Sequence, residues 1–383
     1  MTSRARREVP FNRPTVAPNQ IAYVSESFSS DKISGDGPFT ERAVEALGGV
    51  LGTDRVLLTP SCTAALEMCA LLLGIGPGDE VIVPSFTFVS TANAFALFGA
   101  KVVFADIDPV DFNIDPAHVE QLLTDRTRAV VAVHYGGVAA DLERLGSLCA
   151  DRGIALVEDA AHSMFATHDG RPLGRFGALA TFSFHETKNL SCGEGGALVV
   201  NDERLWDRAR IVREKGTDRS RFLEGLVDKY TWVDLGSSYL MADPLAAVLL
   251  AQLEFSSTIQ DRRRHATARY SSELEVWAKT NDVVLPSPAQ PLNQSAAHLF
   301  ALLLPTRSER DRFLAHARSL GVSSVFHYLP LHSSPFGERC GAVTCPVTDD
   351  VSARLARLPL YSDMTAEDLD LVIDAVGSFE VRT

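Results

Sequence analysis

The chain has 383 residues, of which 46% are apolar and 22% charged, and its formal net charge is −13 at pH 7. These values are ordinary for a globular protein with a large core, and the usual domain size predicts two or three domains. The negative charge argues against a nucleic-acid partner, which would need a concentrated basic patch. No stretch approaches the roughly 18 consecutive apolar residues of a membrane span, so no membrane partner is expected either.

The cysteines and the N-terminus indicate where the protein works. The six cysteines form no C-x-x-C pair and have no histidines at zinc-ligand spacing, so no metal site is expected. Reduced thiols are the simplest account of them, and this favours the cytoplasm. The N-terminal arginines are not followed by an apolar core, which is unlike a secretory signal.

The first two thirds of the chain alternate between strand and helix patterns. Residues 1 to about 30 are polar and are expected to form an extended arm, followed by a helix from about Thr40 to Leu47. Strands are then expected at 57–59, 80–84, 102–106, 129–133, 154–157, 181–184 and 197–200. Helices are expected at 64–73, 89–98, 116–123, 141–152 and 203–215. Alternating elements with continuous apolar strands predict an α/β fold, with a mostly parallel central sheet covered by helices.

The last third differs in composition. Residues 216–243 are irregular, and Pro244 begins a long helix that extends past Arg264. A linker containing Pro286, Pro288 and Pro291 then precedes a smaller α+β unit. Its expected elements are strand 299–304, helix 309–320, a strand near Val325 and helix 366–376. We therefore predict a large domain, residues 1–255, and a small C-terminal domain, residues 256–383.

Ligands of parallel sheets bind beyond the carboxyl ends of the strands. In this chain the rule selects Ser85 to Phe88, His134, Asp159 to His162 and Ser183 to Lys188. The start of helix 64–73 is a further anion site, because its first N–H groups have no partner within the helix. By itself, a capped helix after a strand is commonplace.

Lys188 lies on a short polar loop between two apolar strands, where its side chain is held more rigidly than on the surface. Burial can lower the pKa of such a lysine, and its amine can then form a Schiff base. Most loop lysines are merely solvated, but only six lysines occur here, and arginine cannot do this chemistry. Asp159 ends a strand 29 positions earlier. It is either a helix cap or the acid that keeps the pyridine nitrogen of pyridoxal phosphate protonated.

Four segments occur in an order that points to one family: Pro84-Ser-Phe-Thr-Phe-Val-Ser-Thr-Ala-Asn93, Asp159-Ala-Ala-His162, Ser183-Phe-His-Glu-Thr-Lys188-Asn and Gly193-Glu-Gly-Gly196. Together they resemble the DegT/DnrJ/EryC1/StrS sugar aminotransferases, which are fold-type I pyridoxal phosphate enzymes. The resemblance runs from about residue 10 to the C-terminus. Three more segments resemble the dTDP-4-oxo-6-deoxyglucose 4-aminotransferases, the branch of the enterobacterial common antigen enzyme: Thr59-Pro-Ser-Cys-Thr-Ala, Arg213-Glu-Lys-Gly-Thr and Val227-Asp-Lys-Tyr-Thr-Trp232.

The resemblance implies pyridoxal 5'-phosphate as cofactor and assigns roles to individual residues. Lys188 would carry the cofactor and move protons, and Asp159 would pair with the pyridinium nitrogen. Phe88 would stack on the ring, although an ordinary core aromatic is the alternative, and His162 would lie near O3′ or the ring face. The phosphate would be bound by Ser183, Cys62 and Thr63.

Three further expectations concern the substrate and the neighbouring subunit. Ser238 stands where relatives usually have the Asn that reaches the neighbouring subunit's phosphate, and Leu240 stands where they have Arg. Lys215, His327 and Tyr328 are candidates for substrate contact, and the last two could equally be packing residues. Shared sites would make the working unit at least a homodimer.

The resemblance implies amino transfer from L-glutamate to dTDP-4-oxo-6-deoxy-D-glucose, giving a dTDP-4-amino-4,6-dideoxyhexose, with Lys188 as acid and base. The alternatives are amination at C3 of a dTDP-3-oxo sugar and a non-catalytic binding or regulatory protein on the same scaffold. Lys188 argues against the related sugar 3-dehydratases, which carry His there. No G-x-G-x-x-G follows the first strand, as a nicotinamide dehydrogenase would require. The excess of arginine over lysine suggests a GC-rich genome, and antibiotic sugar biosynthesis is our hypothesis for the pathway.

Overall fold

The computed structural model describes residues 7–285 and 294–382, and the predicted proline-rich linker lies outside them. Within the described residues a seven-stranded sheet has the order β1-β9-β8-β5-β4-β2-β3. Its strands are β1 Val56–Thr59, β2 Glu80–Pro84, β3 Lys101–Ala105, β4 Thr127–Val133, β5 Ala155–Asp159, β8 Leu179–Ser183 and β9 Gly196–Val200. In this sheet β9 runs antiparallel to both neighbours and the other pairs are parallel, which confirms the mostly parallel α/β fold.

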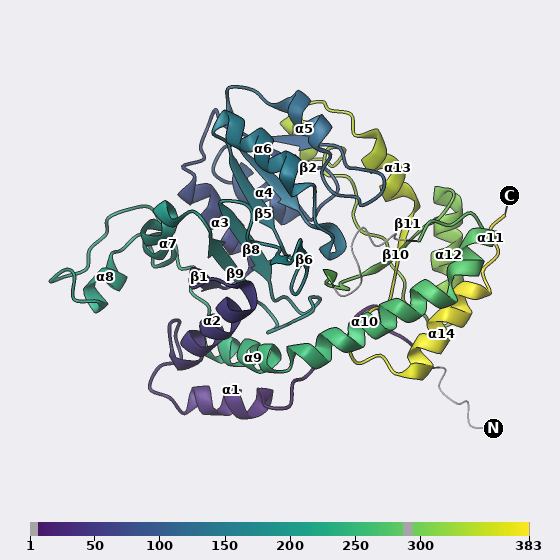
Figure 1. Ribbon diagram of the computed structural model, residues 1–383, viewed down its shortest axis with the longest axis horizontal. Coiled ribbons are helices and arrows are strands. Elements are labelled where there is room, and N and C mark those ends of the chain that lie inside the picture. The colour runs from purple at the N-terminus through teal and green to yellow at the C-terminus, as the bar shows by residue number, and fades with distance from the viewer. Residues whose placement is uncertain (1–6, 286–293, 383) are drawn as a thin grey trace.

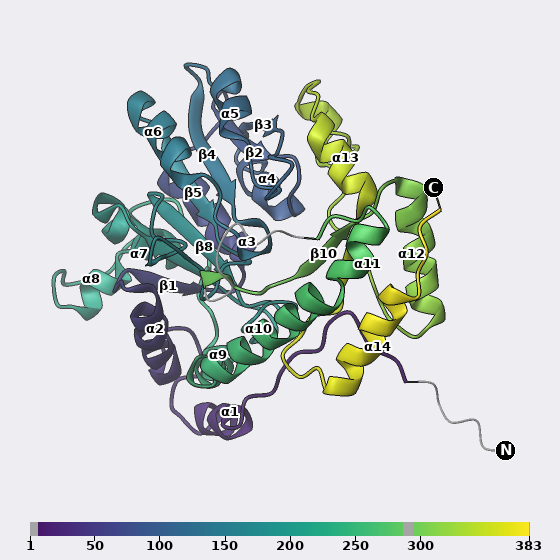
Figure 2. The ribbon, with the colours of Figure 1, turned by 45° about the vertical axis from the view of Figure 1, so that its right-hand side comes forward.

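Helices cover both faces of this sheet (Figures 1 and 2). Alternate strand residues enter different cores: Val81 and Val83 pack toward one face, whereas Ile82 packs toward the other. The first face is covered by α3 Cys62–Leu72, α4 Val89–Ala96 and α7 Trp206–Arg213. The second is covered by α2 Pro38–Leu51, α5 Pro116–Leu122, α6 Leu142–Arg152 and α9 Asp243–Glu254. A sheet covered in this way leaves its strand ends free for a site.

A second, smaller unit has its own core around an antiparallel pair, β10 Phe300–Leu303 and β11 Leu355–Leu358. Its helices are α11 Glu275–Thr280, α12 Arg307–Ser319, α13 Pro346–Arg354 and α14 Ala366–Gly377. The elements α11, α13 and β11 were not predicted from the sequence. Val9, near the N-terminus, also packs in this core and forms a bridge with Val322. The division at residues 255 and 256 stays a prediction.

Two predicted elements were wrong, and the strand predicted near Val325 is only an isolated bridge with Arg357. The single long helix after Pro244 is two helices, α9 and α10 Ser256–Glu273, which meet at Phe255. Phe255 is not in a helical conformation; α9 packs on a core of the large sheet, while Ala266 and Tyr270 of α10 pack on the second core. The N-terminal arm is not extended throughout, since α1 Gln20–Phe28 is a helix. Tertiary contacts fix it: the Tyr23 ring lies 5.5 Å from the Phe39 ring.

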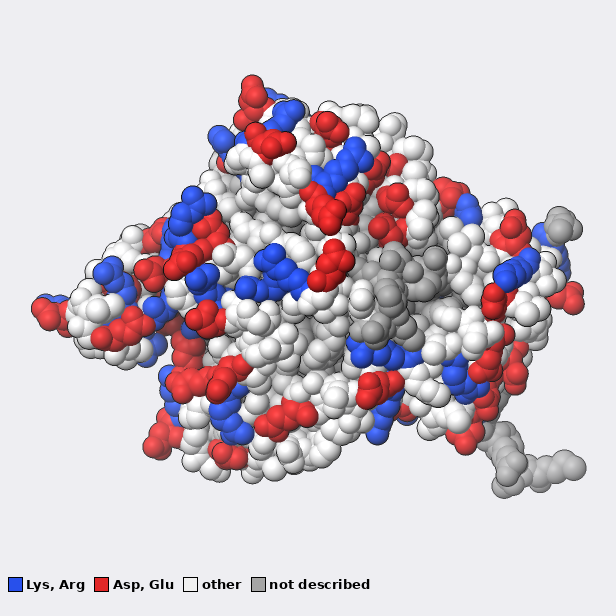
Figure 3. Space-filling view, viewed as in Figure 1, with Lys and Arg blue, Asp and Glu red and all other residues white. Residues whose placement is uncertain are grey.

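The remaining elements lie at the surface. β6 Thr167–His168 and β7 Arg171–Pro172 form a small hairpin, and α8 Arg219–Leu223 lies on a segment that projects from the body (Figure 1). On the face in Figure 3, basic and acidic side chains of the described residues are interspersed, without a large basic patch. None of the described helices combines the length and apolar character needed to cross a membrane.

Candidate active site

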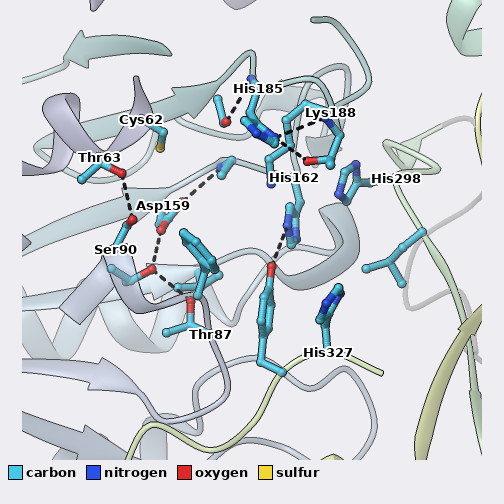
Figure 4. A pocket seen from close by; sticks show the side chains of 18 of the residues that line it. Cys62, Thr63, Thr87, Ser90, Asp159, His162, His185, Lys188, His298 and His327 are labelled. Carbon is cyan, nitrogen blue, oxygen red and sulfur yellow. Dashed lines mark hydrogen bonds between the residues drawn. The ribbon is translucent and has the colours of Figure 1, made fainter. Parts of the chain in front are cut away.

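A cavity of about 510 Å³ lies at the carboxyl ends of β5 and β8 and is closed on one side by the small unit. Ser85 and His134, which the strand-end rule selects, are not part of its lining, because Ser85 is hydrogen-bonded to His332 and His134 to Glu158. The residues to which the resemblance assigns a role, except Ser238 and Lys215, line it from both units of the fold (Figure 4). They are Cys62, Thr63, Phe88, Asp159, His162, Ser183, Lys188, His327 and Tyr328. The strand-end rule thus brings together residues that are far apart in the sequence.

Asp159 is the last residue of β5, and its buried carboxylate is held by two donors. The Thr91 hydroxyl donates to Oδ2 at 2.7 Å, and the Ala161 backbone N–H donates to Oδ1 at 3.2 Å. Thr91 is itself hydrogen-bonded to Thr87 at 3.0 Å. The carboxylate therefore has a fixed orientation toward the cavity. Thr87 lies in the range that the strand-end rule selects, whereas no role was predicted for Thr91, because Thr and Ser are common near helix starts.

Lys188 lies on the loop between β8 and β9, where its backbone N–H donates to His185 O at 2.9 Å. Burial lowers the pKa of Lys188 from 10.5 to about 8, although the nearby Cys62 and Asp159 act in the opposite direction. A lysine with this pKa has a sizeable fraction of neutral amine near neutral pH, which is the nucleophilic form.

The start of α3 faces the cavity from the opposite side (Figure 4). Ser61 caps this helix, accepting from Ala64 N at 3.0 Å, and the first helical bond within it joins Ala65 N to Ser61 O. The N–H groups of Cys62 and Thr63 precede that bond, so they are free to bind an anion. Gly196 permits this arrangement, because a Cβ there would lie 2.4 Å from Cys62 N.

Two stacked imidazoles form another wall. The rings of His162 and His298 are 4.2 Å apart, and the Tyr328 hydroxyl lies 3.3 Å from His162 Nε2. Because Gly136 N–H donates to His162 Nδ1 at 3.3 Å, the proton of His162 is on Nε2. Burial holds the pKa of His162 well below 6.5, so this ring is neutral. His298 was missed by sequence analysis, and the segment around it carries no motif that could have revealed it.

Arg357 and the N-terminal arm were also missed. Arg357 projects from β11 into the cavity, and its Nη1 donates to His327 Nδ1 at 3.3 Å. Phe11 lies over its guanidinium at 5.2 Å, and the adjacent Asn12 donates to Glu186 O at 3.0 Å, on the Lys188 loop. The arm thus spans from the small unit to the loop that carries Lys188. No sequence motif identifies Arg357 or Phe11 as site residues. They come together only in the folded chain, in which β11 pairs with β10.

Ser238 and Lys215 do not line the cavity of their own chain. Ser238 is exposed and forms an isolated bridge with Glu214. Lys215 is exposed as well, with φ of 63°, and its ammonium donates to Glu214 Oε1 at 2.9 Å. Lys215 precedes the projecting α8 segment in the chain, and Ser238 follows it.

The cavity offers three different groups at three separate places. A lysine of lowered pKa suits an aldehyde, a fixed carboxylate suits a ring nitrogen, and a helix N-terminus suits a phosphate. Phe88 lies at the start of α4 with 55% of its surface exposed, free to cover a flat ring. The residues present therefore fit pyridoxal phosphate.

A mostly parallel α/β fold with this site defines a pyridoxal phosphate-dependent enzyme. The model of the DegT/DnrJ/EryC1/StrS aminotransferase family matches residues 14–377. The chain belongs to this family and is an aminotransferase.

Solved structures agree over nearly the full length. The aminotransferase TlmJ from Streptoalloteichus hindustanus is 31% identical, with a TM-score of 0.89, over 97% of this chain and 98% of that one. The putative sugar aminotransferase Spr1654 from Streptococcus pneumoniae, in its PLP form, is 25% identical with the same TM-score, over 97% and 98%. The sugar aminotransferase CalS13 from Micromonospora echinospora is 26% identical with a TM-score of 0.87, over 97% and 99%.

Proposed function

We propose that this aminotransferase transfers the amino group of L-glutamate to C4 of dTDP-4-oxo-6-deoxy-D-glucose, giving a dTDP-4-amino-4,6-dideoxyhexose. The observation that carries the proposal is that Lys188 and Asp159 share one cavity with His327 and Tyr328 of the small unit. The dTDP-sugar and the position of amination are supported by the segments around Thr59, Arg213 and Val227, which resemble 4-aminotransferases.

Each side chain has a role that follows from its position. Bound pyridoxal phosphate supplies an electron sink. Lys188 binds it and carries protons to and from the reacting carbon, which its pKa of about 8 suits. Asp159, held by Thr91, keeps the ring nitrogen protonated. Cys62, Thr63 and Ser183 bind the phosphate, Phe88 covers the ring, and neutral His162 donates from Nε2.

The working unit in this proposal is a homodimer in the cytoplasm. Several apolar side chains on and beside the α8 projection are exposed: Leu223 69%, Leu226 63%, Trp232 74% and Leu235 64%. Exposed apolar side chains gathered on one projection are typical of a protein interface. A partner covering them would approach Lys215 and Ser238, and these would then contact substrate and phosphate across the interface. The six cysteines are free, as in reducing compartments.

The direct test is to incubate the purified enzyme with L-glutamate and dTDP-4-oxo-6-deoxy-D-glucose and to analyse the product by NMR. The proposal predicts an amine on C4, with no product from the Lys188→Ala variant. An amine only on C3, from a dTDP-3-oxo sugar, would favour the alternative substrate. For the pathway, we propose antibiotic sugar biosynthesis; loss of a surface glycan in a deletion strain, with small metabolites unchanged, would contradict it.

A further inference from the structure

Three arginines are buried in the described part of the chain: Arg263, Arg310 and Arg357. A buried guanidinium is stable only when its donors are satisfied. Arg263 donates to the carbonyls of Ala297 and His298, at 3.0 and 2.6 Å. Arg310 donates to the Asp311 carboxylate at 2.7 Å. Both are therefore structural residues.

Arg357 differs from both. It is 7% exposed, yet its Nε is buried without a hydrogen-bond partner. Among residues 7–285 and 294–382, no carboxylate lies within the 4.0 Å of an ion pair with it. Its contacts are one imidazole nitrogen, His327 Nδ1, and the face of Phe11. Neither carries a negative charge, so the guanidinium lacks a counter-ion.

The direction of this side chain follows from the strand. Ala356 and Leu358 point into the core of the small unit, whereas Leu355 packs with Phe86 and Tyr135 of the large unit. Residues two apart share a face, so Arg357 also points toward the large unit, and there it lines the cavity that holds Lys188. Its charge is close enough to contribute to the lowered pKa of Lys188.

We propose that Arg357 binds the α-carboxylate of the amino donor, an inference that rests on the proposed function. Guanidinium and carboxylate match as a bidentate pair, and burial strengthens such a pair. The α-carboxylate is attached to the carbon that reacts at Lys188, so it must bind close to that lysine. Phe11 and His327 hold the guanidinium in position from two sides.

The two other anions that enter the site fit Arg357 less well. The cofactor phosphate belongs at the start of α3, and Figure 4 shows Cys62 and Thr63 across the cavity from His327, the neighbour of Arg357. In the nucleotide sugar, the diphosphate is on C1 while the reacting carbon is C4, so the sugar ring separates the diphosphate from Lys188. A deeply buried arginine beside that lysine suits the donor better.

The test compares holoenzymes of the wild type, Arg357→Met, Arg357→Lys and a control, Arg262→Met. Arg262 is half-exposed on α10 and pairs with Asp363, outside the cavity. The first readout is calorimetric binding of glutarate, which has carboxylates but no amine. The second is binding of dTDP. The third is the rate at which L-glutamate or 4-aminobutyrate, which lacks the α-carboxylate, bleaches the cofactor band.

Arg357→Met is expected to weaken glutarate binding roughly 10- to 100-fold. It should also abolish the preference for L-glutamate over 4-aminobutyrate and leave dTDP binding within twofold. Arg357→Lys should give intermediate glutarate binding, because it keeps the positive charge but loses the two parallel N–H donors of the guanidinium. It also provides the test if the Met variant does not fold. Arg262→Met should match the wild type.

Unchanged glutarate binding in folded Arg357→Met and Arg357→Lys would overturn the proposal, as would weakened dTDP binding with normal glutarate binding, which would assign Arg357 to the diphosphate. The measurement of glutarate binding involves no sugar. A wild-type enzyme that fails to aminate dTDP-4-oxo-6-deoxy-D-glucose would therefore refute the proposed substrate and leave the result for Arg357 standing.

Discussion

The Thr91 hydroxyl donates a 2.7 Å hydrogen bond to Asp159 Oδ2, from the first turns of α4 to the end of β5. This bond joins two elements that are 68 positions apart in the sequence. It fixes the carboxylate that, in the proposed function, faces the cofactor ring, so we expect the two residues to act together.

Thr91→Val should weaken cofactor binding, because it removes a donor to a buried carboxylate without changing the side-chain shape. A hydrogen bond to a charged group contributes about 1.5 kcal/mol at the lower end, which is roughly tenfold in affinity. Thr91→Ser keeps the hydroxyl and is the control. Titration of the apoenzyme with pyridoxal phosphate measures the Kd, and equal values for Val and Ser variants would refute this role.

Capture of the cofactor by the apoenzyme should depend on pH with a midpoint near 8. Burial lowers the pKa of Lys188 to about 8, and the neutral amine that attacks the aldehyde accumulates as pH rises through that value. The rate of formation of the yellow band, followed from pH 6 to 10, measures this directly. A rate that keeps rising toward pH 10, as for a solvated lysine, would contradict the lowered pKa.

Glu158 should stabilise the fold next to the site. Its fully buried carboxylate accepts from His134 Nε2 at 3.0 Å and from three backbone N–H groups, those of Gly174, Phe176 and Gly177. Glu158→Gln places an amide against these donors, so we expect a loss of roughly 2–3 kcal/mol in the free energy of unfolding. Urea unfolding measures it, and the exposed Glu143→Gln is the control.

The same contribution should depend on pH. Burial alone would raise the pKa of Glu158, but the hydrogen bonds from His134 and from the backbone hold it below 4.5. A carboxylate with a lowered folded-state pKa stabilises the protein above its unfolded pKa and loses this effect as pH falls through the folded value. The difference between wild type and Glu158→Gln should therefore be largest near neutral pH and shrink below about 4.5. A stability difference between wild type and Glu158→Gln that grows as pH falls would contradict the lowered pKa of Glu158.

Leu226→Asp combined with Leu223→Asp should disrupt self-association. Leu226, just after α8, is 63% exposed, and Leu223, at the end of α8, is 69% exposed. If a partner subunit buries these positions, an aspartate there would lose its hydration and destabilise the dimer. Burying the two introduced carboxylates without partners should cost about 2 kcal/mol or more, so the dimer Kd should rise at least roughly 30-fold. Sedimentation measures it, with Val276→Asp on α11, 76% exposed, as control. An unchanged dimer would place the interface elsewhere.

The sequence predicted the site best where chemistry and strand ends coincide. Asp159 and Ser183 end strands whose apolar runs are clear, and Lys188 follows one of them, so the strand-end rule located all three without knowledge of the packing. Arg357 lies within a short strand of the small unit, where its side chain could as well have been solvated. Its place depends on pairing with β10 and on contact with Phe11 from the far end of the chain. α1 was missed for the same reason, since tertiary contacts with α2 and α9 stabilise it.

The central claim is that Lys188 binds pyridoxal phosphate and that L-glutamate donates its amine there. Visible absorbance of the purified protein, before and after addition of L-glutamate, tests it most directly. We predict a yellow band that L-glutamate bleaches and that is absent from Lys188→Ala before any amine is added. A protein that stays colourless after incubation with pyridoxal phosphate, or a Lys188→Ala variant with the same band, would contradict the account.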